Sequence, residues 1–133
     1  MKKVLFVCAE NAGRSQMAEA FFNHYAQEKG LDWTAESAGT IPAKEVNPNV
    51  IEVMREKGID LTSKKPKLFV PERINEYQKV ISFGCLVKEF FSADVQGRIE
   101  EWHIKDPSDK SPEEIKRIRD EVENKVINLI NTL

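Results

Sequence analysis

The sequence has few of the features that mark several large classes of protein. It contains only two cysteines and two histidines among 133 residues, too few for a disulfide framework or a common zinc pattern. Its formal net charge is −2, with no long block of one sign, so charge gives no reason to expect nucleic-acid or membrane binding. No apolar run has the length of a transmembrane helix, and Glu10 interrupts the short run near the N-terminus. We therefore expect a soluble cytoplasmic protein without a bound metal.

Length and periodicity predict one α/β domain spanning residues 1–133. A hydrophobic content of 41% is enough for a substantial core. Apolar runs predict four strands, the last of them weak, at residues 3–7, 33–37, 79–83 and 98–104. Helical spacing and capping residues predict three helices, at residues 14–29, 47–58 and 111–133. Because strands alternate with helices, we expect a parallel sheet flanked by helices on both faces.

The stretch CAENAGRS, at residues 8–15, joins the first predicted strand to the first predicted helix. Backbone N–H groups at a helix N-terminus lack partners, and the helix dipole adds positive potential, so this loop should attract a tetrahedral oxyanion. Arg14 adds a planar fork that can hold two oxygens. The same field stabilises a thiolate at Cys8. Ser15 is placed to donate its hydroxyl to that thiolate, although a helix-capping role explains it equally well. Gly13 allows a tight turn with positive φ if the loop requires one.

Two further residues are candidates for the chemistry of this site. A thiolate that attacks phosphorus needs an acid for the leaving oxygen, and Asp106 is our candidate. On the residues alone, an ordinary Asp-Pro turn is the simpler explanation of Asp106-Pro107. Cys85 follows the third predicted strand, within the weakly periodic segment 84–97 that we expect to be a mobile loop. A small buried hydrophobic role explains Cys85 equally well.

Four motifs together resemble the low-molecular-weight protein tyrosine phosphatase superfamily, and more narrowly its thioredoxin-coupled arsenate reductase branch. They are CAENAGRSQMAEA, SAGT, NPNVIEVMREKGIDLTS and EEWHIKDP. The resemblance implies a four-stranded parallel sheet with flanking helices. It also implies that Cys8 is the nucleophile, that Ser15 orients its thiolate and that Asp106 is the general acid. The residues that it implies for oxyanion binding are Ala9, Glu10, Asn11, Ala12, Gly13 and Arg14.

The same resemblance makes Cys85 the residue that separates reduction from hydrolysis. A phospho-Cys8 adduct can only be hydrolysed, whereas an arseno-Cys8 adduct can also be attacked at sulfur by a second thiol, which forms a disulfide and releases arsenite. Cys85 matches the first resolving cysteine of the reductase branch. The branch's usual third cysteine is missing, because residues 86–92 read LVKEFFS. We therefore expect an external thiol reductant, thioredoxin-like, glutaredoxin-like or small, to reach the Cys8–Cys85 bond directly.

Some members of the reductase branch bind potassium beside the oxyanion loop through Asn, Glu, Ser and Asp side chains. Asn11, Glu19 and Ser37 match three of these positions, and Lys67 stands where the aspartate would be. We hypothesise that the Lys67 ammonium replaces the potassium ion and braces the loop through Glu19 and Asn11. The alternative is that the site is lost and that Lys67 is solvated.

Three functions are compatible with these residues. The first is an arsenate reductase that uses Cys8 and Cys85. The second is a phosphatase acting on phosphotyrosine or small phosphoesters through Cys8, Arg14 and Asp106. Ser108 and Asp109 follow the Asp-Pro where phosphatases of the family typically carry tyrosines, which argues against a phosphotyrosine pocket. The third is a non-enzymatic oxyanion-binding protein, which would need neither a reactive thiol nor an acid.

Overall fold

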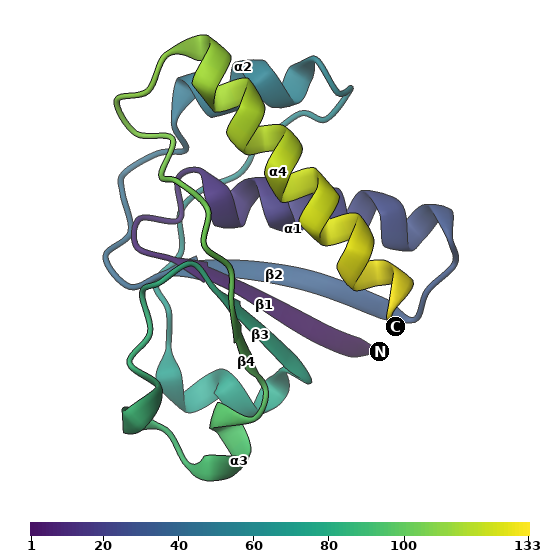
Figure 1. The fold of residues 1–133 in the computed structure, drawn as a ribbon, viewed down its shortest axis with the longest axis vertical. Coiled ribbons are helices and arrows are strands. Elements are labelled where there is room, and N and C mark those ends of the chain that lie inside the picture. Colours follow the sequence, from purple (N-terminus) through teal and green to yellow (C-terminus); the bar gives the residue numbers. More distant parts are fainter.

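Four parallel strands form the central sheet in the order β2-β1-β3-β4 (Figure 1). The computed structural model describes residues 1–133. The strands are β1 (Lys2–Cys8), β2 (Trp33–Gly39), β3 (Lys79–Ser82) and β4 (Ile99–Glu101). Because all four run in the same direction, their carboxyl ends meet at one edge of the sheet, where ligands of such folds bind. Cys8 ends β1 at that edge, directly opposite Gly39 of β2. The predicted four-stranded parallel sheet is confirmed.

Three long helices cover one face of this sheet (Figure 1). They are α1 (Arg14–Glu28), α2 (Pro48–Arg55) and α4 (Pro112–Asn131). The predicted caps are present: the Asn47 side chain accepts from Asn49 N–H, and the Ser111 side chain accepts from Glu114 N–H. The face they cover holds the larger apolar core, which includes Phe6, Phe21 and Ile115. No helix in the structure is both long enough and apolar enough to span a membrane.

The opposite face is covered by short elements that periodicity did not predict. A 3-10 helix spans Pro71–Glu76, a second spans Lys88–Phe90, and α3 spans Ala93–Gln96. These elements pack a smaller core against the sheet, with Leu5, Val7, Ile74, Val80 and Val95 among its members. Part of the segment 84–97, which we expected to be a loop throughout, is therefore helical. Its helices are shorter than the window over which helical periodicity can be detected.

Candidate active site

The Cys8 sulfur lies at the bottom of the loop that joins β1 to α1. Its side chain is 3% exposed. The Asn11 N–H donates to Sγ at 3.2 Å, and Ser15 Oγ lies 2.9 Å from Sγ. Two hydrogen-bonding groups, one from the loop backbone and one from a side chain of α1, therefore converge on this sulfur. The structure thus places Ser15 where the sequence predicted, beside the thiol.

Asn11 decides which way the Ser15 hydroxyl points. Its side-chain amide donates to Ser15 Oγ at 2.7 Å, so the serine oxygen is an acceptor there and its own proton is free to donate to the Cys8 sulfur. The amide is itself oriented, because its oxygen accepts from Gln16 Nε2 at 3.1 Å and from the Lys67 backbone N–H at 2.9 Å. Asn11 has a φ of 54°, in the left-handed region that asparagine tolerates better than most residues. The sequence predicted Asn11 only as a loop and cation-site residue.

The chain after β2 turns the loop's carbonyl groups away from the pocket. The carbonyls of Cys8, Ala9, Glu10 and Ala12 accept backbone hydrogen bonds of 2.7 to 3.2 Å from residues within the range 40–47. The N–H groups of Glu10, Ala12 and Gly13 donate to no other protein atom. Unpaired N–H groups on the pocket side of a loop form an anion-binding nest.

Gly39 allows this contact between β2 and the loop. A Cβ atom at Gly39 would lie 2.7 Å from the Ala9 carbonyl oxygen and 2.9 Å from the Asn11 nitrogen, distances that backbone atoms cannot accommodate without shifting. The SAGT motif carries this glycine. The sequence alone did not show why a glycine is needed there, because the close approach involves residues about 30 positions away in the chain.

Arg14 and Asp106 lie at the same small pocket as Cys8. Its other lining residues are Glu10, Ala12, Gly13, Asn47, Pro107 and Ser108. Arg14 Nη1 donates to the Ile104 carbonyl at 2.9 Å, and the guanidinium lies over the Phe83 ring at 5.6 Å. The cavity encloses about 20 Å³, so it can bury no more than the oxyanion group of a substrate.

Asp106 is exposed at the mouth of the pocket, on a loop that rests on Gly13. Its Oδ1 accepts from the Ser108 N–H at 2.9 Å, as in an Asx turn. A Cβ atom at Gly13 would lie 2.6 Å from Pro107 Cγ. Gly13 has a φ of −144°, so the loop does not use the positive φ that we considered. A glycine is required here because a side chain would collide with Pro107. Asp106 therefore forms an ordinary Asp-Pro turn and also lies at the pocket, where a general acid is needed.

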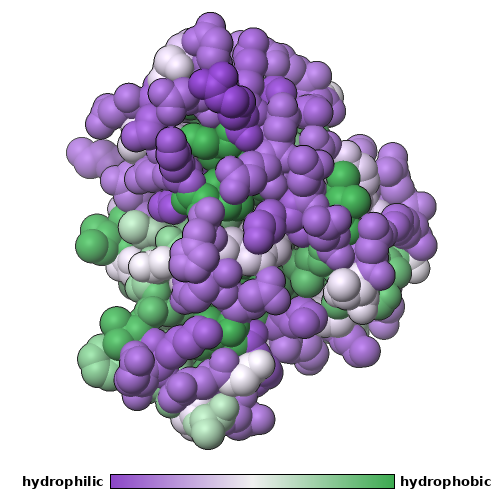
Figure 2. Space-filling model, in the orientation of Figure 1, coloured by the Kyte–Doolittle hydropathy of each residue, from purple (hydrophilic) through white to green (hydrophobic).

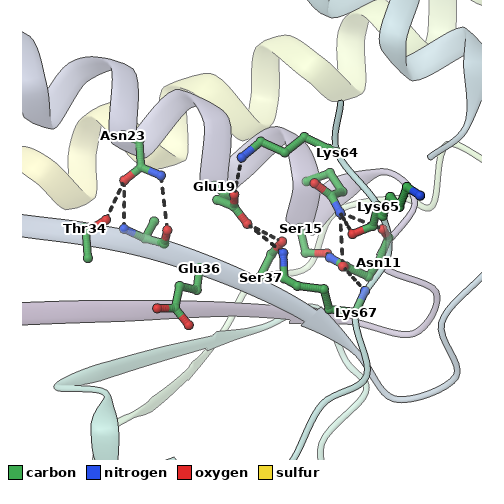
Figure 3. A network of polar contacts seen from close by, with 12 residues as sticks. Asn11, Ser15, Glu19, Asn23, Thr34, Glu36, Ser37, Lys64, Lys65 and Lys67 are labelled. Carbon is green, nitrogen blue, oxygen red and sulfur yellow. Dashed lines mark hydrogen bonds and ion pairs between the residues drawn. The ribbon is translucent and has the colours of Figure 1, made fainter. Parts of the chain in front are cut away.

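Behind the loop, a buried carboxylate is surrounded by two ammonium groups (Figure 3). Glu19 is 5% exposed and accepts from Ser37 Oγ at 2.6 Å. Lys64 Nζ lies 3.2 Å from it and Lys67 Nζ lies 3.7 Å from it. The hypothesis placed the Lys67 ammonium on both Glu19 and Asn11. The Lys67 ammonium lies beside Glu19. The Asn11 side-chain oxygen instead accepts from the backbone N–H of Lys67. The second ammonium group, that of Lys64, was not predicted from the sequence. No three His, Cys, Asp or Glu side chains are grouped closely enough to hold a metal ion.

Cys85 lies beside the end of β1, in contact with the smaller core. Its thiol donates to the Val7 carbonyl at 3.3 Å, and Ser82 Oγ lies 3.8 Å from its sulfur. Val7 immediately precedes Cys8. Burial raises the pKa of the Cys85 thiol, and the charge of nearby Cys8 raises it further. The thiol is partly exposed and is not paired in a disulfide with Cys8.

Residues 3–133 match the family model described as low molecular weight phosphotyrosine protein phosphatase, and the chain belongs to this family. It is 34% identical over 134 residues to the glutaredoxin arsenate reductase of Synechocystis sp., covering 98% of this chain and 97% of that one. The structure of an arsenate reductase in the phosphate binding state is 33% identical, with a TM-score of 0.83 and coverage of 99% and 98%. The low molecular weight protein tyrosine phosphatase of T. tengcongensis superposes with a TM-score of 0.90 at 26% identity, over the whole of both chains. This chain is an enzyme of the phosphatase and arsenate reductase family.

Proposed function

We propose that this enzyme reduces arsenate to arsenite, with Cys8 as nucleophile and Cys85 as the resolving thiol. The observation that carries the proposal is the contact of the Cys85 thiol with the Val7 carbonyl, one residue before Cys8. Hydrolysis through Cys8 does not require a second thiol, whereas reduction does. The arsenate reductases among the relatives, at about one-third identity, support the same activity.

The first step places arsenate in the loop and joins it to Cys8. The unpaired N–H groups and Arg14 hold its oxygens. The Cys8 thiolate attacks arsenic, and one arsenate oxygen leaves as water with a proton from Asp106. This forms a Cys8–S–As(V) bond without any change of oxidation state.

The second step is the reduction. The Cys85 thiolate attacks Cys8 Sγ, the S–As bond breaks, and its electron pair stays on arsenic, which leaves as As(III). Cys8 and Cys85 are oxidised to a disulfide. With no third cysteine in the chain, an external thiol must reduce that disulfide, and the name of the Synechocystis relative favours a glutaredoxin-like reductant over the thioredoxin-like alternative.

Phosphoester hydrolysis is a second candidate, favoured by the position of Asp106 at the mouth of the Cys8 pocket. Hydrolysis needs only the loop, Cys8, Arg14 and this acid. No aromatic residue lines the pocket, so small phosphoesters fit it better than phosphotyrosine, whose ring would gain no stacking partner.

One experiment separates the two activities. Arsenite release and p-nitrophenyl phosphate hydrolysis are measured for the wild type, Cys8→Ser and Cys85→Ser, with dithiothreitol, glutaredoxin and thioredoxin as separate reductants. We expect Cys8→Ser to lose both activities, because an alcohol stays protonated at this site. Cys85→Ser should lose arsenite release and keep hydrolysis. Wild-type rates of arsenite release from Cys85→Ser with a protein reductant would refute the role of Cys85 as the resolving thiol. Hydrolysis without arsenite release from the wild type, whatever the reductant, would leave the phosphatase.

A further inference from the structure

An apolar groove surrounds Cys85 on the face of the sheet opposite α1 and α4. It encloses about 390 Å³, and its lining residues are Thr40, Phe69, Pro71, Cys85, Leu86, Val87, Phe90 and Phe91. We call these eight residues the Cys85 groove. Phe90 is 85% exposed and Val87 is 50% exposed. Figure 2 shows hydrophobic residues gathered at the lower left, where Figure 1 places the segment that follows β3.

Two of the most exposed large hydrophobic side chains of the protein, Val87 and Phe90, line this groove. Two others, Leu68 and Val70, line a neighbouring pocket that shares Phe69 with the groove. Isolated exposed hydrophobic residues are normal on a protein surface, but a cluster of this kind marks an interaction site. Because the groove contains a thiol, the chemistry of its partner is restricted.

The two sulfurs of a Cys8–Cys85 disulfide would differ in access and in leaving ability. Cys8 is 3% exposed, and its sulfur is enclosed by the oxyanion loop. Cys85 is partly exposed and opens into the groove. Cys8 is also the better leaving group, because Asn11 N–H and Ser15 Oγ stabilise its thiolate. Access and leaving ability therefore both favour attack at Cys85.

We propose that the Cys85 groove docks a protein dithiol reductant, whose thiolate attacks the Cys85 sulfur. This inference rests on the proposed reductase function and names the partner and point of attack. The partner's first sulfur bonds to Cys85 Sγ as the Cys8–Cys85 bond breaks, and Cys8 leaves as a thiolate. The partner's second thiolate then attacks the partner's first sulfur and releases Cys85. Two electrons pass to the enzyme, and the two thiols of the partner are oxidised to a disulfide.

The composition of the groove and of the chain selects a protein dithiol over glutathione. A charged tripeptide gains little from an apolar lining, whereas apolar burial is the usual source of affinity between proteins. With only two cysteines in the chain, the mixed disulfide at Cys85 has no third enzyme thiol to resolve it. A second thiol on the partner supplies that step.

The first test identifies the sulfur that is attacked. The Cys8–Cys85 disulfide is prepared with diamide, independently of arsenate turnover, and is mixed with glutaredoxin or thioredoxin whose second cysteine has been replaced by serine. Such a variant traps the mixed disulfide, and peptide mass spectrometry locates it. We expect the adduct on Cys85. An adduct on Cys8 would overturn the proposal, whatever the arsenate activity of the enzyme.

The second test addresses the groove itself, with Phe90→Asp as the variant and Asn124→Asp, an exposed position on α4, as the matched control. Phe90→Asp should reduce kcat/KM for the protein reductant about tenfold, since a charge replaces a large exposed apolar side chain of the groove. Reduction of the same disulfide by dithiothreitol and hydrolysis of p-nitrophenyl phosphate should be unchanged in both variants. Equal rates for Phe90→Asp and Asn124→Asp with the protein reductant would overturn the proposal. A second result would also overturn it. If the protein forms a concentration-dependent dimer that Phe90→Asp abolishes, while the rate with the protein reductant stays the same, the groove binds a second copy of the chain instead. Absence of arsenite release with every reductant would instead reject the proposed function.

Discussion

The hydrogen bonds to the Cys8 sulfur come from residues within seven positions of it in the chain. This closeness explains why the sequence alone could place Cys8, Arg14 and Ser15 in one site. Once the strand-loop-helix order is recognised, the loop has little freedom to arrange them otherwise. The role of Asn11 could not be predicted in this way. Its amide is oriented by the Lys67 backbone, 56 positions away, and the chain around Lys67 has no periodic pattern.

A pair of substitutions at Asn11 tests whether its amide directs the Ser15 hydroxyl. Asn11→Gly and Asn11→Ala both remove the amide, and both should lower kcat for p-nitrophenyl phosphate about tenfold. Alanine at a φ of 54° carries an additional backbone cost, so Asn11→Ala should be less stable than Asn11→Gly by about 1 kcal/mol. Denaturant unfolding measures this difference. A wild-type kcat in Asn11→Gly would show that the Ser15 hydroxyl does not need the Asn11 amide to orient it.

Glu19 gives a second prediction at the scale of single residues. Each lysine beside it is about half exposed, so Lys64→Met or Lys67→Met alone should cost less than about 1 kcal/mol of unfolding free energy. The double variant leaves a buried carboxylate without a cation and should cost about 3 kcal/mol. Adding Glu19→Gln should restore most of the lost stability, because the amide carries no charge.

Activity provides an independent readout of the same cluster. If the two ammonium groups occupy the place of a bound cation, wild-type activity should be insensitive to potassium, and the double lysine variant should be less active and respond to it. The control is sodium at the same ionic strength. Potassium stimulation of the wild type would contradict the assignment, as would a fully active double variant.

At the scale of elements, the three longer helices were predicted and the short helices on the opposite face were not. The capping residues and apolar stripes of α1, α2 and α4 were sufficient to predict these helices. The fourth strand ends at Glu101, short of the predicted residue 104, because the apolar signal continues past the sheet: Trp102 and Ile104 are buried in the larger core. Burial in a core and pairing in a sheet leave the same signal in a sequence.

The contact between Gly13 and Pro107 joins the oxyanion loop to the loop that carries Asp106. In Gly13→Ala, the new Cβ would displace Pro107 and move the acid away from the leaving oxygen. An acid matters most for a poor leaving group. We therefore expect hydrolysis of phenyl phosphate to fall about tenfold more than hydrolysis of p-nitrophenyl phosphate.

Gly97→Ala is the matched control for this substitution. Gly97 has a helical φ, and its nearest neighbour to a new Cβ is 3.5 Å away, an ordinary contact. Both substrates should therefore be hydrolysed at wild-type rates. If Gly13→Ala lowers the two hydrolysis rates by the same factor, the contact does not position Asp106.

At the scale of the whole molecule, the sheet separates two cores, and one cysteine belongs to each side. Cys8 is part of the core under the long helices, whereas Cys85 packs against the smaller core. Both cysteines follow parallel strands and therefore lie at the same edge of the sheet. The sequence could not predict the groove around Cys85, since the residues that line it come from three separate segments of the chain.

This division predicts that reduction and hydrolysis depend differently on pH. Burial raises the pKa of the Cys85 thiol, so only a small fraction is thiolate near neutral pH. Since the thiolate is the attacking species, single-turnover formation of the Cys8–Cys85 disulfide from the arsenate adduct should accelerate about tenfold per pH unit between about pH 7 and pH 8.5. Hydrolysis of p-nitrophenyl phosphate does not use Cys85 and should lack this rise. Quenched-flow mass spectrometry of the disulfide gives the first rate, and nitrophenolate absorbance gives the second. In Cys85→Ser the hydrolysis profile should be unchanged, and a parallel rise of both wild-type rates would place the titrating group in the oxyanion loop instead of at Cys85.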